Sequence, residues 1–108
     1  MNKKGITKEI KRIKDKIVEQ YRPQKIILFG SYAYGKPDHD SDVDFLIIMP
    51  FKGKGQYKAL EILERISPPI PIDLLVRTPS QVKTRIAQHD FFMSKLLTKG
   101  KILYEAPR

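Results

Sequence analysis

The chain has 108 residues and a mass of 12.5 kDa, with 41% hydrophobic and 31% charged residues. This balance is typical of one folded domain, here residues 1–108. The absence of cysteine excludes a disulfide scaffold, a thiolate zinc site and a cysteine nucleophile. No apolar run approaches the roughly 20 residues of a membrane helix, and no signal-peptide pattern follows the basic N-terminus. We therefore expect a cytoplasmic protein with no membrane partner.

The formal net charge of +9 is unevenly distributed. Residues 1–25 carry nine basic and three acidic side chains, whereas residues 26–50 carry one lysine against four aspartates. The basic parts would attract a nucleotide or nucleic acid, but a solvated lysine-rich surface is the favoured explanation of the charge alone, so nucleic acid is not the favoured partner. The cluster of four aspartates needs its own explanation, because like charges repel.

The first predicted element is an amphipathic helix over about residues 7–21. Its apolar residues recur at helical spacing, and Thr7 is the expected N-cap. Pro23 ends the helix. The apolar residues in question are Ile6, Ile10, Ile13, Ile17 and Tyr21. They form either part of the core or a surface for a partner.

Two strands are predicted next, over residues 25–29 and 42–49, separated by the Gly30–Ser31 turn and a polar loop. This connection is too short for a parallel crossover, so we expect the two strands to be antiparallel.

The second half of the chain predicts further helices and strands. Thr78 and Pro79 form an N-cap and first-position pair. The predicted elements are a helix over 57–66, a strand over 70–76, a helical region from 79 broken near 88–90, and a strand over 101–105. The expected fold class is therefore α+β, with a mixed sheet of about four strands and helices packed on it.

Asp42 and Asp44 are the first candidate site residues. Side chains alternate along a strand, so both should point to the face of Leu46 and Ile48. Two adjacent carboxylates at a buried strand repel one another, and a divalent cation between them would remove that cost. Mg²⁺ prefers such oxygen ligands together with waters and substrate phosphates.

Asp73 is a charge within an otherwise apolar strand. If that strand lies beside the one containing Asp44, three carboxylates could hold two metal ions for phosphoryl chemistry, with Asp73 accepting a proton. The alternative is that Asp73 pairs with Arg77 or a lysine.

The Gly30–Ser31 turn is the candidate phosphate site. Glycine permits close backbone approach, free N–H groups in the following turn suit a phosphate, and the Ser31 hydroxyl adds a donor. Tyr32 and Tyr34 could stack on a base, although packing against the first helix is favoured.

Two stretches together resemble the signature of the nucleotidyltransferase (DNA polymerase β-like) superfamily. They are Gly30-Ser31-Tyr32-Ala33-Tyr34-Gly35 and Ser41-Asp42-Val43-Asp44-Phe45. With the chain length and residues 100–105, they are similar to its minimal nucleotidyltransferase branch.

The resemblance implies Mg²⁺, ATP or another NTP, and transfer of a nucleoside monophosphate, with Ser41 joining Gly30 and Ser31 at the nucleotide. It also implies an antitoxin role, in which a HEPN toxin is adenylylated on tyrosine. The family commonly has Arg at the position of Tyr34, and Lys36 is a candidate replacement for that charge.

The sequence thus predicts a Mg²⁺-dependent protein adenylyltransferase whose acceptor is another chain, with a homo-oligomer left open. The alternative is a catalytically inactive binding module that neutralises a partner or binds nucleic acid through its basic surface.

Overall fold

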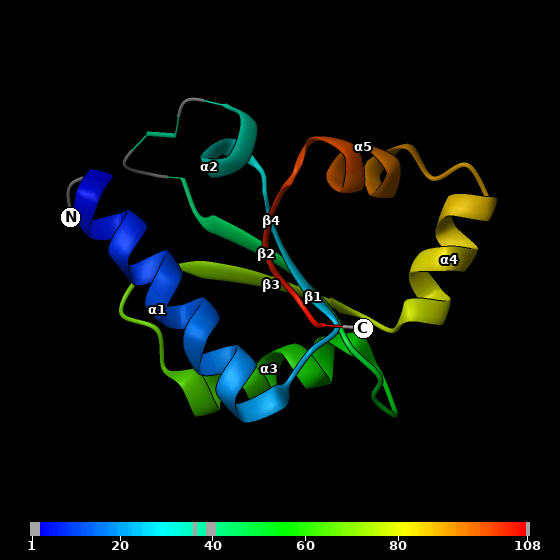
Figure 1. Cartoon of the computed structure of the whole chain (residues 1–108), viewed down its shortest axis with the longest axis horizontal. Helices are drawn as coiled ribbons and strands as arrows, with labels where there is room; N and C mark the ends of the chain where they lie inside the picture. Colours follow the sequence, from blue (N-terminus) through cyan, green and yellow to red (C-terminus); the bar gives the residue numbers. More distant parts are fainter. Residues whose placement is uncertain (1–2, 36, 39–40, 108) are drawn as a thin grey trace.

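A computed structural model describes residues 3–35, 37–38 and 41–107. These residues form five helices and four strands (Figure 1). In chain order they are α1 (Lys3–Tyr21), β1 (Lys25–Phe29), α2 (Ser31–Tyr34), β2 (Val43–Ile48), α3 (Gly55–Ile66), β3 (Ile72–Arg77), α4 (Pro79–Ala87), α5 (Phe91–Lys99) and β4 (Lys101–Glu105).

The four strands form one mixed sheet in the order β3-β2-β1-β4. β1 is antiparallel to both β2 and β4, whereas β2 and β3 are parallel. The antiparallel pairing of the first two strands and the α+β class are therefore confirmed. Pro71, which has no N–H group, immediately precedes the outer strand β3, and its carbonyl accepts from Val43 N–H at 3.2 Å.

Helices cover both faces of the sheet (Figure 1). α1 and α3 contribute Ile17 and Ile62 to a core cluster that also holds Phe45. On the other face, Met93 and Leu96 of α5 pack against a cluster that holds Leu46. Since Phe45 and Leu46 are neighbours on β2, the predicted alternation of this strand between two buried faces is confirmed.

The apolar stripe of α1 is core and not a partner surface. Ile13 and Ile17 are buried, and Ile6, Ile10 and Tyr21 pack against the same cluster. The predicted start of this helix was wrong. α1 begins at Lys3, so Thr7 lies within it, and Ile6 gains a core contact from the added turn.

The other predicted boundaries hold to within two residues. Thr78 caps α4 in a capping box with Gln81, as Thr-Pro indicated. The predicted break separates α4 from α5, where His89 has a positive φ of 58° and Asp90 caps the next helix. Among the described helices, none combines the length and the apolar character that crossing a membrane requires.

Candidate functional site

The site begins with Asp44 and Asp73, which are direct partners across the parallel strands β2 and β3. Paired residues of neighbouring strands project to the same face of a sheet. Leu46 and Leu75, two residues further along, belong to the cluster under α5. The two carboxylates therefore lie side by side on the α5 face, where the sheet ends.

Asp44 carries the electrostatic cost of this arrangement. Burial raises the pKa of its carboxyl group, and the negative charges of Asp73 and then Asp42 raise it further. Among the described residues, no ion pair or side-chain hydrogen bond of Asp42, Asp44 or Asp73 is found. Within the part of the chain that the structure describes, no cationic side chain pairs with these carboxylates.

The alternative partner for Asp73 is engaged elsewhere. Arg77 donates from Nη1 to the carbonyl of Val76 at 2.8 Å. Burial lowers the pKa of its guanidinium, and the positive charge of Arg85 lowers it further. Arg77 lies at the opposite end of β3 from Asp73 and does not neutralise it.

Asp42 is the least fixed of the three. β2 begins at Val43, so Asp42 lies outside the strand that was predicted to include it, and its side chain is exposed. Strand alternation therefore does not set its direction. Within the described ranges, no three Asp, Glu, His or Cys side chains are gathered closely enough to hold a metal ion by themselves.

Gly30 is fitted to the Asp44 carboxylate. Phe29 pairs with Asp44 across β1 and β2, and Gly30 follows with φ 77° and ψ −159°. A Cβ atom at this position would collide with Oδ2 of Asp44. The sequence suggested that this glycine leaves room for a phosphate, whereas the structure shows that it first leaves room for a carboxylate.

The turn after Gly30 forms the short helix α2. The carbonyl of Gly30 accepts from the N–H groups of Ala33 at 3.0 Å and Tyr34 at 3.2 Å. Ser31 is half-buried at its start, and its hydroxyl has no hydrogen-bond partner among the described residues. The Ser31 hydroxyl thus lies one residue after Gly30, the residue that leaves room for the Asp44 carboxylate.

Ser41 is used within the loop before β2. Its hydroxyl accepts from Asp38 N–H at 3.1 Å and donates to the Asp38 carboxylate at 3.3 Å. These bonds tie Ser41 to Asp38, and the contact of Ser41 with the nucleotide stays a prediction. Lys36 and Asp40 lie outside the described residues.

Tyr32 and Tyr34 have different environments. Tyr32 packs against the cluster under α1 and α3, in line with the favoured packing interpretation. Tyr34 is 41% exposed, and Lys95 of α5 lies over its ring, 5.1 Å from Nζ to the centroid. No local sequence spacing indicated that α5 would reach the Gly30 turn.

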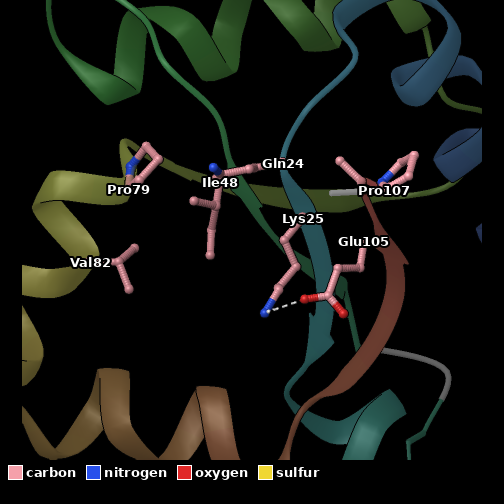
Figure 2. Close-up of a pocket in the computed structure, with 8 residues that line it drawn as sticks. Gln24, Lys25, Ile48, Pro79, Val82, Glu105 and Pro107 are labelled. Carbon is pink, nitrogen blue, oxygen red and sulfur yellow. Dashed lines mark ion pairs between the residues drawn. The ribbon is translucent and has the colours of Figure 1, made fainter.

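A pocket of about 410 Å³ lies at the other end of the sheet, with Ile48, Pro79 and Val82 in its wall (Figure 2). Its cation, Lys25, pairs with Glu105 at 3.1 Å. The charge is thus already neutralised, and the described residues that line the pocket offer a phosphate no other cation.

The acidic end has the donor set that a hard divalent cation prefers. Mg²⁺ commonly binds one or two carboxylates and completes its shell with waters and substrate phosphates. Two adjacent carboxylates, with no ion pair to another described residue, fit a metal ion that arrives with a phosphate-bearing substrate. They do not form a closed structural metal cage.

Comparisons with known proteins agree with this arrangement. A family model described as "Nucleotidyltransferase domain" matches residues 10–103. No curated protein is detectably similar in sequence.

Several solved structures share the fold. A presumed nucleotidyltransferase from Sulfolobus solfataricus has a TM-score of 0.63 at 18% identity, over 91% of this chain and 78% of that one. A toxin–antitoxin structure with AMP-PNP has a TM-score of 0.58 at 19% identity, covering 89% and 73% of the two chains. A mutant of the toxin–antitoxin MntA–HpeT has a TM-score of 0.51 at 19% identity, covering 98% and 74%.

Proposed function

The chain belongs to the nucleotidyltransferase domain family, and from that premise we propose that it transfers AMP from ATP, with Mg²⁺, to a hydroxyl group on a partner protein. Domains of this family generally use divalent metal ions. A cytoplasmic location and a single minimal domain over residues 1–108 belong to the same proposal.

The observation that carries this proposal is the pairing of Asp44 with Asp73 beside the Gly30 turn. Like charges at paired positions destabilise a sheet. Among the described contacts, Asp44 and Asp73 make no ion pair or side-chain hydrogen bond that would be lost if they were replaced. Groups held in an unfavourable electrostatic environment cluster at functional sites. A role in binding Mg²⁺ and a nucleotide explains why they are present.

Each residue has a role in the proposed reaction. Asp44 and Asp73, with Asp42, are the proposed ligands of Mg²⁺. Ser31 and the backbone of Gly30 would bind the triphosphate, with Ser41 as a further proposed contact. When bound, the metal ion would stabilise negative charge on the phosphates and on the attacking oxygen.

The proposed transfer is an in-line displacement. The acceptor oxygen bonds to the α-phosphorus of ATP, and the bond from that phosphorus to the β-phosphate bridging oxygen breaks, releasing pyrophosphate. The hydroxyl proton passes to Asp73, which is exposed and unpaired among the described residues.

The partner is proposed to be a HEPN-type toxin that this chain inactivates as an antitoxin. Support comes from the shared fold with toxin–antitoxin structures, one of which contains AMP-PNP. Separation of catalyst and acceptor on two chains would also explain why the acidic end of the sheet is open to an incoming hydroxyl.

Incubation with α-labelled ATP, Mg²⁺ and the product of the neighbouring gene tests this function. We expect label on the partner with the wild-type chain and none with Asp42→Asn or Asp44→Asn. Equal labelling by wild type and both variants, or no labelling at all, would contradict the proposed transfer.

The second candidate is a binding module without catalysis, and one observation favours it. Among the described side chains, three metal ligands are not gathered into a group. Such a module would bind and neutralise the partner, or bind nucleic acid, with no covalent label. Partner binding by the Asp44→Asn variant, without transfer by wild type, would favour this alternative.

A further inference from the structure

We propose that Lys95 of α5 forms the second wall of the nucleotide site and binds the triphosphate opposite Asp44 and Asp73. This inference rests on the proposed function. It assigns a phosphate-binding role to a residue distant in sequence from both the Gly30 turn and the acidic residues.

Lys95 lies on α5, the helix that covers the face of the sheet to which Asp44 and Asp73 project. Phe29 is the cross-strand partner of Asp44, so both side chains project to the α5 face. The ring of Phe92 packs edge-on against Phe29, with centroids 5.8 Å apart. Lys95 follows Phe92 by three residues and shares its side of the helix.

Lys95 also reaches the turn that begins at Gly30. Its Nζ lies 5.1 Å from the ring centroid of Tyr34, the last residue of α2. Figure 1 shows α2 and α5 at the same end of the sheet. The cation is therefore held against the proposed phosphate turn.

The charge of Lys95 is available for a ligand. The side chain is exposed, and no ion pair joins it to a carboxylate among the described residues. A cation–π contact at an exposed site is weak. A charge-assisted hydrogen bond to a phosphate is stronger, so Lys95 can exchange the ring for the ligand.

The nucleotide needs such a cation. A triphosphate carries more negative charge than one divalent metal ion neutralises, and Asp44 and Asp73 add further negative charge on the same face. The remaining repulsion must be relieved from another side of the ligand. Lys95 is a described cation that the fold brings to the Gly30 turn from that face.

Lys101 provides a matched control at the same end of the sheet. It lies at the start of β4, opposite Leu28 of β1, and Leu28 belongs to the cluster under α1 and α3. Lys101 therefore projects from the opposite face. Lys95→Met and Lys101→Met remove the same charge and keep a long apolar stem.

Calorimetric titration of the whole chain with ATP–Mg²⁺ and with AMP tests the proposal, and thermal melts of each variant check the fold. We expect Lys95→Met to raise the Kd for ATP about tenfold, the effect of losing about 1.4 kcal/mol. The effect on AMP should be smaller. Lys101→Met should change the Kd for ATP less than twofold, and Lys95→Arg should retain most of the affinity.

Three results would overturn the inference. Unchanged ATP affinity in a folded Lys95→Met variant would refute it and leave the proposed function standing. An equal loss in Lys101→Met would show that only overall charge matters. Failure of the wild-type chain to bind ATP–Mg²⁺ would refute the proposed function together with this inference.

Discussion

The two ends of the same sheet treat charge in opposite ways. At one end, Lys25 and Glu105 are partners across β1 and β4, and their side chains form an ion pair at 3.1 Å. At the other end, Asp44 and Asp73 are partners across β2 and β3, and both charges are negative. β1 runs from one end to the other, a span of about 13 Å.

The difference separates a pair of charges that neutralise one another from a pair for which we propose a function. The opposite charges of Lys25 and Glu105 neutralise one another, so this pair needs no ligand, even though a pocket opens beside it (Figure 2). Burial raises the pKa of the Asp44 carboxyl group and the adjacent negative charge of Asp73 raises it further, so ionised Asp44 is unfavourable in this position. Of these two pairs of charges, the Asp44–Asp73 pair is the one whose electrostatic energy a bound cation would improve.

Substitution of Asp44 should give the largest functional effect. Asp44→Asn removes a proposed metal ligand, and we expect transfer to the partner to fall by about 1,000-fold, or ~4 kcal/mol in the barrier. Because the substitution also removes an unpaired charge, the melting temperature should stay the same or rise. Labelling assays and melting curves measure the two effects.

The paired end supplies the control for this experiment. Glu105→Gln should leave transfer unchanged, because Glu105 lies at the other end of the sheet. If both substitutions reduced transfer equally, the contrast between the two ends would be lost.

Gly30 and Gly53 test the fit between the turn and Asp44. Both have a positive φ, but only a Cβ at Gly30 would collide with Asp44, and nothing lies within 4 Å of one at Gly53. Gly30→Ala should lower the free energy of unfolding by about 2–4 kcal/mol, and Gly53→Ala by about 1 kcal/mol. Denaturant melts of the two variants measure this difference.

A substitution of Asp44 separates two costs of Gly30→Ala, the strain of the backbone at a positive φ and the collision with the Asp44 side chain. In an Asp44→Ala background, which lacks the colliding oxygen, Gly30→Ala should cost less free energy of unfolding than in wild type, and the cost that remains reports the strain of the positive φ. A neutral Gly30→Ala variant would contradict the described contact.

Stability should depend on pH through Asp44. Because its folded-state pKa is raised, the folded chain holds this proton more tightly than the unfolded chain does. Its contribution to stability is fully present below the unfolded pKa of about 3.9 and is lost as the pH rises through the higher folded value. Relative to Asp44→Asn, wild type should therefore be least stable above the folded pKa.

Melting curves of wild type and Asp44→Asn between acidic and neutral pH check this sign. The difference in melting temperature should shrink as the pH falls, and Mg²⁺ should shrink it at neutral pH. A difference that grew toward low pH would refute the described electrostatics.

The smallest effect should come from the ion pair at the opposite end. The side chains of Lys25 and Glu105 are 30% and 56% exposed, so solvent screens their attraction. Glu105→Gln should cost at most about 1 kcal/mol, with the loss decreasing at high salt. A salt-independent loss would show that packing and not charge stabilises this end.

The sequence predicted the fold well because its signals are local. The β-branched run of β1, the Thr78–Pro79 cap and the helical stripe of Ile13 and Ile17 each specify one element without long-range information. The start of α1 was missed because residues 3–5 add no apolar side chain to the stripe and Thr7 is a residue type that favours the N-cap position.

The site was predicted in part. Alternation placed Asp44 on one face, but that Asp73 faces it in register follows from the pairing of β2 with β3, which only the tertiary structure shows. The collision that makes Gly30 necessary and the approach of Lys95 to Tyr34 likewise join residues far apart in the chain. No spacing within one element encodes such contacts.

The central claim is that the acidic end of the sheet binds a divalent metal ion with the nucleotide. Crystals grown with AMP-PNP and Mn²⁺ in place of Mg²⁺ would locate the metal by its anomalous scattering. We predict a Mn²⁺ peak in contact with the carboxylates of Asp44 and Asp73, and a triphosphate at the Gly30 turn. A nucleotide bound beside Lys25 and Glu105, or a metal ion that contacts neither aspartate, would contradict the account.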